Sequence, residues 1–201
     1  VAEIGPGNGS LCEKYNTYCD NVVLFEPSKN LFKNLETKFQ SNEKIKINNS
    51  EFSSSNKKFD CFLLMDVIEH IENPQTLIKS LYDSLNENGK ILINVPAFQH
   101  LYSKFDEDVG HFKRYTKSSF VKELLLIKPK KVKMFYYDFL GYFLSLVSQL
   151  LFLVSKKYKK NYKKGFKSKI KLWNYLIPIS KILDRCAINS LGKSLFIIIN
   201  K

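Results

Sequence analysis

The first nine residues have the side chains and the spacing most suggestive of chemistry. An apolar stretch reaches Glu3 and is followed by glycines at alternate positions, Gly5, Gly7 and Gly9. Glycine permits a positive φ and, lacking a Cβ, lets a ligand approach the main chain closely. The spacing differs from the G-x-G-x-x-G turn that holds a pyrophosphate. An acid at such a bend would repel a pyrophosphate and attract an ammonium group. The stretch therefore favours a ligand with a nucleoside half and an amino-acid half; the alternative is a purely structural glycine turn.

A second acid, Glu26, follows the short apolar run at 22–25, which is typical of a buried parallel strand. Ligands bind at the carboxyl edge of such sheets, and a carboxylate there can accept both hydroxyls of a ribose. Glu26, with Pro27 directly after it, is therefore predicted to contact the nucleoside. The alternative is a solvated carboxylate in a loop.

The segment 59–71 reads F-D-C-F-L-L-M-D-V-I-E-H-I, an apolar strand that runs into a polar turn. Met65 and Asp66 end this strand, and the resemblance described below implies that they line the ligand. His70 is a candidate catalytic base that Glu69 would orient. In the alternative interpretation, Glu69 and His70 only fix the loop that follows the strand.

Residues 97–119 form a connection that is too long for an ordinary loop and is rich in aromatic and acidic side chains. Because it starts at the carboxyl edge of the sheet, we expect a lid that forms the acceptor pocket. His111 is the first candidate for the catalytic base, since its unperturbed pKa of ~6.5 allows it to take a proton at neutral pH.

Other side chains of the predicted lid complete this hypothesis. Asp106 would orient His111, while Tyr102 and Tyr115 would shape the pocket. Arg114 would hold an acceptor carboxylate or phosphate. The alternative is a salt bridge between Arg114 and Asp106 beside a packed, hydrogen-bonded His111.

Taken together, these motifs resemble the class I S-adenosylmethionine (SAM) dependent methyltransferases over roughly residues 1–120. The opening stretch is similar to motif I, whose acid and glycines hold the methionine part of SAM, and segment 59–71 is similar to the strand-4 motif of small-molecule methyltransferases. The string V-P-A-F…D-E…G-H-x-x-R-Y-T resembles a bacterial subgroup associated with glycan or lipid modification. The resemblance implies SAM as cofactor. It also implies an adenine contact after the third strand, where this sequence offers only Ser50 and Glu51.

The elements that must position these residues alternate between strand and helix. Strands are predicted at 22–26, 45–47, 59–65, 90–96 and 131–137, and helices at 10–18 with Ser10 as N-cap, at 73–89 with Gly89 as C-cap, and at 118–127. This alternation predicts an α/β fold, a Rossmann-like, doubly wound, mostly parallel sheet in a single domain over 1–201. The resemblance implies seven strands, with the last (194–200) antiparallel beside the sixth. The chain opens inside a strand, so we expect that N-terminal helices are missing.

The net charge of +13 is unevenly distributed. Residues 1–120 are nearly neutral, with a slight excess of acids, whereas residues 121–201 carry all of the excess of lysine and arginine. Two different roles are implied for the two parts. The four cysteines and three histidines show no mutual ligand spacing. We therefore expect a reducing, cytoplasmic location and no metal site.

Residues 139–154 are nearly all apolar, and lysines interleaved with aromatic residues follow at once. These 16 residues fall short of the ~20 needed to span a bilayer. An apolar helix with a polybasic flank is typical of an anionic membrane interface, so a helical insertion at 139–188, interrupted by Pro178, is predicted to lie peripherally on the membrane. The alternative is a helix buried on the sheet or in a dimer contact. Binding of nucleic acid is disfavoured, because it would need no apolar helix.

The functional hypothesis is SAM-dependent O-methylation of a glycan, a lipid-linked sugar or another amphiphilic small molecule. No N-P-P-Y string follows the fourth strand, which disfavours methylation of amino groups on adenine or glutamine. Two rivals remain open: a catalytically silent membrane adaptor that uses the same fold, and a nicotinamide-dependent oxidoreductase, which the spacing of Gly9 argues against.

Overall fold

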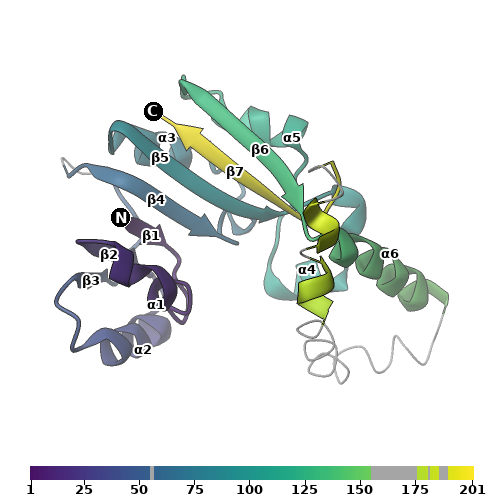
Figure 1. The fold of residues 1–201 in the computed structure, drawn as a ribbon, viewed down its shortest axis with the longest axis horizontal. Helices are drawn as coiled ribbons and strands as arrows, with labels where there is room; N and C mark the ends of the chain where they lie inside the picture. Colours follow the sequence, from purple (N-terminus) through teal and green to yellow (C-terminus); the bar gives the residue numbers. More distant parts are fainter. Residues whose placement is uncertain (55–56, 155–175, 181, 186–189) are drawn as a thin grey trace.

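The computed structural model describes residues 1–54, 57–154, 176–180, 182–185 and 190–201. Seven strands form one sheet in the order β3-β2-β1-β4-β5-β7-β6 (Figure 1). The strands are β1 (Ala2–Ile4), β2 (Val22–Phe25), β3 (Ile45–Asn48), β4 (Phe59–Met65), β5 (Leu85–Pro96), β6 (Lys131–Tyr137) and β7 (Ser194–Asn200).

Strands β1 to β5 pair in parallel, and β7 pairs antiparallel with both β5 and β6. Residue Ile197 lies opposite Ile93 on one side and Met134 on the other. This confirms the predicted Rossmann-like sheet and the predicted placement of the last strand beside the sixth. The polar residues that follow β1, β2, β4 and β5 therefore meet at one edge of the sheet.

The burial of the strands explains why this sequence forms such a sheet. All three residues of β1 and the first three of β2 are buried, as expected for central parallel strands that are covered on both faces. Strand β7 alternates instead, with Leu195, Ile197 and Ile199 buried. These side chains join one hydrophobic core with the apolar residues of β4 and β5.

Helices and 3-10 turns separate most of the strands along the described part of the chain. They are α1 (Cys12–Tyr15), α2 (Lys29–Phe39), α3 (Gln75–Asp83), α4 (Lys104–Val109), α5 (Lys117–Val121) and α6 (Phe139–Val154), with 3-10 turns η1 (Asn16–Tyr18), η2 (Ile68–His70), η3 (Gln99–Leu101) and η4 (Lys122–Leu124).

Several predicted boundaries are wrong. Ser10 caps no helix, since α1 begins at Cys12 after Leu11 and turns into a 3-10 helix at Asn16. Helix α3 ends at Asp83, and Leu85 belongs to β5 rather than to the helix. Gly89 is therefore a strand residue, because the pairing of β4 with β5 extends the strand backward as far as Leu85.

The predicted helix at 118–127 is also shorter than expected. It is divided into α5 and the 3-10 turn η4, which ends at Leu124. Thr116 caps α5 by accepting a hydrogen bond from the Ser119 amide. The sequence pattern could not reveal the change to 3-10 geometry, because the apolar side chains keep a similar spacing in both helix types.

Helix α6 confirms the predicted helical state of residues 139–154, and it extends away from the sheet at the end of β6 (Figure 1). Many of its apolar side chains are exposed, including Val147, Leu150 and Leu153. Within the described part of the chain, no helix combines the length and the hydropathy that crossing a membrane requires. Of the predicted insertion that follows, residues 176–180 and 182–185 are helical; its polybasic segment at 155–175 lies outside the described residues.

Candidate active site

The glycine turn after β1 has the backbone that its sequence predicted. Gly5, Gly7 and Gly9 have φ angles of 62°, 58° and 74°. A Cβ on Gly5 would lie 2.9 Å from Val67 Cγ2, and one on Gly9 would lie 2.7 Å from Leu35 Cδ2. A Cβ on Gly7 would meet no described atom within 4 Å. Gly5 and Gly9 thus pack against the protein, whereas Gly7 presents bare main chain to open space.

Glu3 lies under this turn and is buried. Its Oε2 accepts a hydrogen bond of 2.6 Å from the Tyr15 hydroxyl. Burial raises the pKa of Glu3, although the bond from Tyr15 partly opposes this. Tyr15 was not singled out in the sequence, because a tyrosine twelve residues away carries no local signal of this contact.

Glu26 follows β2 and joins it to the glycine turn. Its Oε2 accepts from the Gly7 amide at 3.2 Å, and its Oε1 accepts from the Ser28 amide at 2.9 Å. Each carboxylate oxygen keeps a further lone pair for a ligand hydroxyl. Asn49, which the sequence analysis did not assign, donates to the Glu26 and Pro27 carbonyl oxygens at 2.9 and 3.2 Å.

The candidate adenine contacts, Ser50 and Glu51, are exposed at the end of β3, and Pro27 is exposed at the end of β2. Together with the glycine turn and Glu26, they lie along adjacent carboxyl ends of parallel strands. This set of residues fits SAM: a cradle without a Cβ at Gly7, and buried acids at both Glu3 and Glu26 for an ammonium group and for ribose hydroxyls.

Asp66 ends β4 with an unusual backbone, at φ 58°. Its Oδ1 accepts from Asn94 Nδ2 at 2.7 Å, and Asn94 Oδ1 in turn accepts from the Tyr137 hydroxyl at 2.8 Å. Burial raises the pKa of Asp66. This chain of bonds fixes Asp66 beside Met65, which is half-buried at the same strand end.

Glu69, His70 and His111 come together although 41 residues separate the last two. One potential ligand atom of each lies within 4.8 Å of the others, and Glu69 Oε1 is 3.9 Å from His111 Nε2. The imidazole rings of His70 and His111 meet edge to face, with centroids 4.7 Å apart. No metal site was expected from the sequence, because the spacing of histidines and cysteines along the chain shows no ligand pattern. Such spacing cannot reveal that η2 and His111 meet in the folded chain.

Glu69 is fully buried, and neither of its carboxylate oxygens meets a hydrogen-bond donor among the described residues. Burial raises its pKa to about 8. His70 is more exposed, and its pKa is lowered by desolvation and by the neighbouring His111. A neutral imidazole therefore predominates at His70 at neutral pH.

Asp106 holds His111 in place. Its Oδ1 accepts from His111 Nδ1 at 2.8 Å, while Arg114 donates to both carboxylate oxygens, from Nε at 2.8 Å and from Nη2 at 3.0 Å. Although burial alone would raise it, the hydrogen bonds from Arg114 and His111 lower the pKa of Asp106. Asp106 also completes a capping box with Ser103 at the start of α4.

Two of the predicted pocket residues differ from expectation. The Arg114 guanidinium is buried, and each of its three nitrogens donates a hydrogen bond, Nη1 to the Ala97 carbonyl at 3.3 Å and the other two to Asp106. This is the salt bridge of the alternative interpretation, and it directs the charge of Arg114 at Asp106. Tyr115 is 1% exposed and packs edge to face on Phe120, so it belongs to the core rather than to a pocket wall.

Tyr102 has a positioning contact. Its hydroxyl donates to the His111 carbonyl at 2.7 Å, and its own carbonyl accepts from Gln149 Nε2 of α6 at 3.1 Å. A second contact joins His100 Nε2 to the Tyr142 hydroxyl at 3.0 Å. Helix α6 therefore rests on the segment that carries His111.

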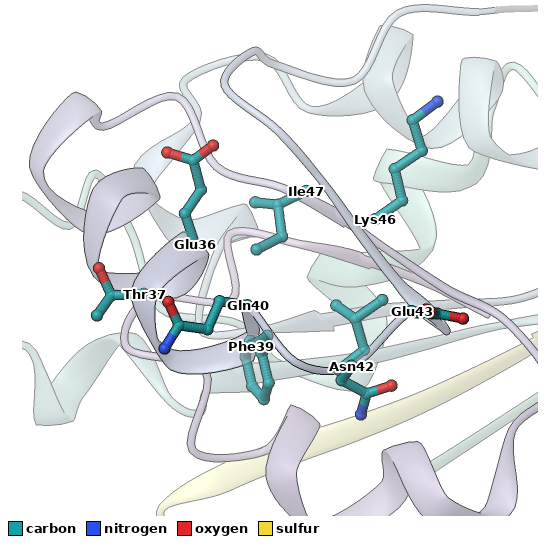
Figure 2. Close-up of a pocket in the computed structure, with 9 residues that line it drawn as sticks. Glu36, Thr37, Phe39, Gln40, Asn42, Glu43, Lys46 and Ile47 are labelled. Carbon is teal, nitrogen blue, oxygen red and sulfur yellow. The ribbon is translucent and has the colours of Figure 1, made fainter.

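A separate hollow lies between α2 and the edge strand β3 (Figure 2). Its lining comes from α2, the turn after it and the first residues of β3. It contains none of the residues assigned above, and it lies away from the strand ends where the conserved geometry of parallel sheets places ligands. We therefore assign the site to the carboxyl edge of the sheet.

Comparison with known proteins agrees with this geometry. A family model described as a methyltransferase domain matches residues 1–125. Among curated proteins, a ubiquinone biosynthesis O-methyltransferase of Rickettsia canadensis is 24% identical over 159 residues, which cover 69% of this chain. The chain spans 66% of the length of that relative.

Solved structures share the fold at low identity. A SAM-dependent methyltransferase from Archaeoglobus fulgidus aligns over 100% of this chain and 85% of its own, with a TM-score of 0.63 and 15% identity. The Haemonchus contortus phosphoethanolamine N-methyltransferase 2, in complex with phosphomonomethylethanolamine and S-adenosylhomocysteine, aligns over 100% and 48%, with a TM-score of 0.65 and 14% identity.

Proposed function

Because this chain belongs to the class I SAM-dependent methyltransferase family, we propose that it transfers a methyl group from SAM to a hydroxyl of an amphiphilic small molecule. A glycan or a lipid-linked sugar is the preferred class of acceptor. The observation that carries the O-methyl assignment is the Asp106–His111 pair, which leaves His111 Nε2 directed toward Glu69 at the carboxyl edge of the sheet.

SAM is the cofactor of this family, and four features of the site would hold it. Glu3 and the bare main chain at Gly7 would face its amino-acid half, Glu26 its ribose, and Ser50 or Glu51 its adenine. When bound, SAM supplies a methyl group on a positively charged sulfur, which leaves as neutral S-adenosylhomocysteine (SAH) when the acceptor oxygen takes the methyl.

Side chains of the 97–119 segment would remove the proton of the acceptor hydroxyl. Asp106 accepts the Nδ1 hydrogen of His111, which fixes the tautomer with a lone pair on Nε2. The acceptor O–H bond would break as the new O–CH3 bond forms, with the proton passing to Nε2. His70 lies against the same ring and is a second candidate for this role.

Replacing His111 by Gln tests this assignment. General-base catalysis typically contributes 10²–10⁴-fold, so turnover is expected to fall by about that factor. Titration with SAH should show unchanged affinity, because Glu3, Gly7 and Glu26 are untouched. Full turnover in His111→Gln would contradict the base assignment, whereas loss of SAH binding would point to a damaged fold.

The curated relative is named for O-methylation in ubiquinone biosynthesis, which supports a hydroxyl acceptor with an apolar portion. We expect label from methyl-labelled SAM to enter a lipid extract and to remain attached to oxygen on product analysis. Firm binding of SAH without any transfer would favour the silent membrane adaptor instead. The family membership argues against the nicotinamide-dependent oxidoreductase, and titration with NAD checks this directly.

A peripheral position on the inner face of the membrane would bring the acceptor to the site. The exposed apolar residues of α6 and the lysine-rich sequence after it support this proposal, since such a combination binds anionic interfaces. Helix α6 also contacts the His111 segment through Gln149. An apolar surface would thus adjoin the acceptor site.

Co-sedimentation with liposomes measures this association. Binding to vesicles containing anionic lipid is expected to be strong at low salt and to weaken steeply as salt is added, because the lysines act through screened charge. A Leu150→Glu, Leu153→Glu double variant should bind more weakly, since it places charge on the exposed face of α6. Equal binding to neutral and anionic vesicles would count against the proposal.

A further inference from the structure

The cluster of Glu69, His70 and His111 has a property that a proton-transfer role does not explain. Glu69 is fully buried, yet its two oxygens receive no hydrogen bond from any described residue. Burying a carboxyl group without partners is costly, so such groups are rare in the absence of a ligand. The nearest polar atom of the cluster is His111 Nε2, at 3.9 Å.

In both imidazoles, Nδ1 is the nitrogen that has a hydrogen-bond partner. His111 Nδ1 donates to Asp106 Oδ1 at 2.8 Å, and His70 Nδ1 lies 3.2 Å from the Gly110 carbonyl oxygen, which can only accept. In its neutral form, each ring would therefore carry the hydrogen on Nδ1 and the lone pair on Nε2. Histidine ligands of metals almost always have the other nitrogen fixed in this manner by a carboxylate or a carbonyl.

The backbone also holds the three residues together. The Phe112 amide donates to the Glu69 carbonyl at 2.8 Å, which joins η2 to the segment that follows α4. The Tyr102 hydroxyl donates to the His111 carbonyl, and Arg114 fixes Asp106 by donating to both of its carboxylate oxygens. The ligand set is thus built on three bonded supports, not on the chance proximity of surface side chains.

We propose that Glu69, His70 and His111 bind a divalent transition-metal cation such as Zn²⁺, Co²⁺ or Mn²⁺. Two imidazoles and a carboxylate form the mixed donor set of catalytic zinc and related sites, which leave further positions open to substrate. Ca²⁺ and Mg²⁺ prefer oxygen donors throughout and fit the set less well.

The distances allow this with small movements. Two ligand atoms at ~2.1 Å from a tetrahedral ion lie about 3.4 Å apart, against 3.9 Å between Glu69 Oε1 and His111 Nε2 and at most 4.8 Å within the whole group.

The role of the cation, unlike its binding, rests on the proposed methyl transfer. In the metal-free chain, His111 Nε2 is the proton acceptor proposed above. In the metal-bound chain the same nitrogen is a ligand, and the cation would take over this step by lowering the pKa of the acceptor hydroxyl, so that the proton leaves to solvent water.

Titration of the tag-free chain, stripped with a chelator, tests the binding directly. Co²⁺ followed by calorimetry and by visible absorption should show one saturable equivalent. Glu69→Gln and His70→Asn should each weaken binding at least 10-fold, since loss of an outer-shell partner alone costs 10–100-fold. His100→Gln is the matched control, because His100 contacts Tyr142 outside the cluster and should bind Co²⁺ as the parent does.

A thermal measurement guards against misfolded variants. Glu69→Gln removes a buried carboxyl that has no hydrogen-bond partner among the described residues, so the unfolding midpoint of this variant should not fall. Zn²⁺ should raise the unfolding midpoint of the parent chain but not that of the variant. Absence of saturable Co²⁺ binding, or unchanged affinity in both cluster variants, would overturn the proposal. SAH titration is run separately, so that failure of the methyltransferase assignment and failure of the metal site give different results.

Discussion

Replacing Arg114 by Met is expected to destabilise the protein by about 3–5 kcal/mol, the usual result of removing one partner of a buried ion pair. Asp106 would remain buried with a negative charge, and it would lose two hydrogen bonds of 2.8 and 3.0 Å. For a chain of this size such a loss lowers the unfolding midpoint by roughly 6–20 °C. Thermal unfolding followed by circular dichroism measures the shift.

The control for this variant is Lys104→Met. Lys104 also pairs with acids of helix α4, but in solvent, through contacts with Glu107 and Asp108. Exposed pairs of this kind contribute little, so the midpoint should hardly change. Equal unfolding midpoints for Arg114→Met and Lys104→Met would show that the buried ion pair contributes no more to stability than the exposed one.

The glycines of the first turn should respond to alanine in two different ways. Gly9→Ala combines a strained positive φ with a Cβ 2.7 Å from Leu35 Cδ2 and 2.8 Å from Phe39 Cε2, so a loss of about 2–4 kcal/mol is expected. Gly7→Ala meets no such contact, and its cost is limited to the backbone strain of about 1–2 kcal/mol. Chemical denaturation compares the two variants.

Their affinity for SAH should separate them further. A Cβ at Gly7 would extend into the open space where we propose that SAM meets the main chain. SAH affinity is therefore expected to drop at least 10-fold, a change of about 1.4 kcal/mol in the free energy of binding, at a small cost in stability. Wild-type affinity in a folded Gly7→Ala would remove this turn from the cofactor site.

The sheet was predictable because its signals are local. Apolar runs such as 59–65 and 131–137 end at polar or turn residues, and the structure has the same boundaries. The boundary near residue 85 was not predictable, because Leu85 continues the apolar spacing of α3 while its backbone pairs with Phe59 across the sheet. That pairing is a long-range contact, which periodicity cannot register.

The site was predictable only as a set of strand ends. Glu3, Glu26 and Asp66 each follow an apolar run, and parallel topology gathers them at one edge. The hydrogen bonds that these carboxylates accept could not be predicted from the sequence. Tyr15 donates to Glu3 and Asn94 donates to Asp66, and both partners are distant along the chain. The buried state of Arg114 was open between two interpretations, and only packing could decide between them.

The position of β7 has a consequence for synthesis of this chain on the ribosome. Among the strands that the structure describes, β6 pairs only with β7, which comes later in the chain, and the edge of β5 that β7 covers has no other partner. Until residue 200 has left the exit tunnel, a nascent chain must therefore carry an uncovered strand edge and the apolar 139–154 segment at the same time. Such edges can pair with those of neighbouring chains, so the nascent chain is expected to be more prone to aggregation before β7 is released than after.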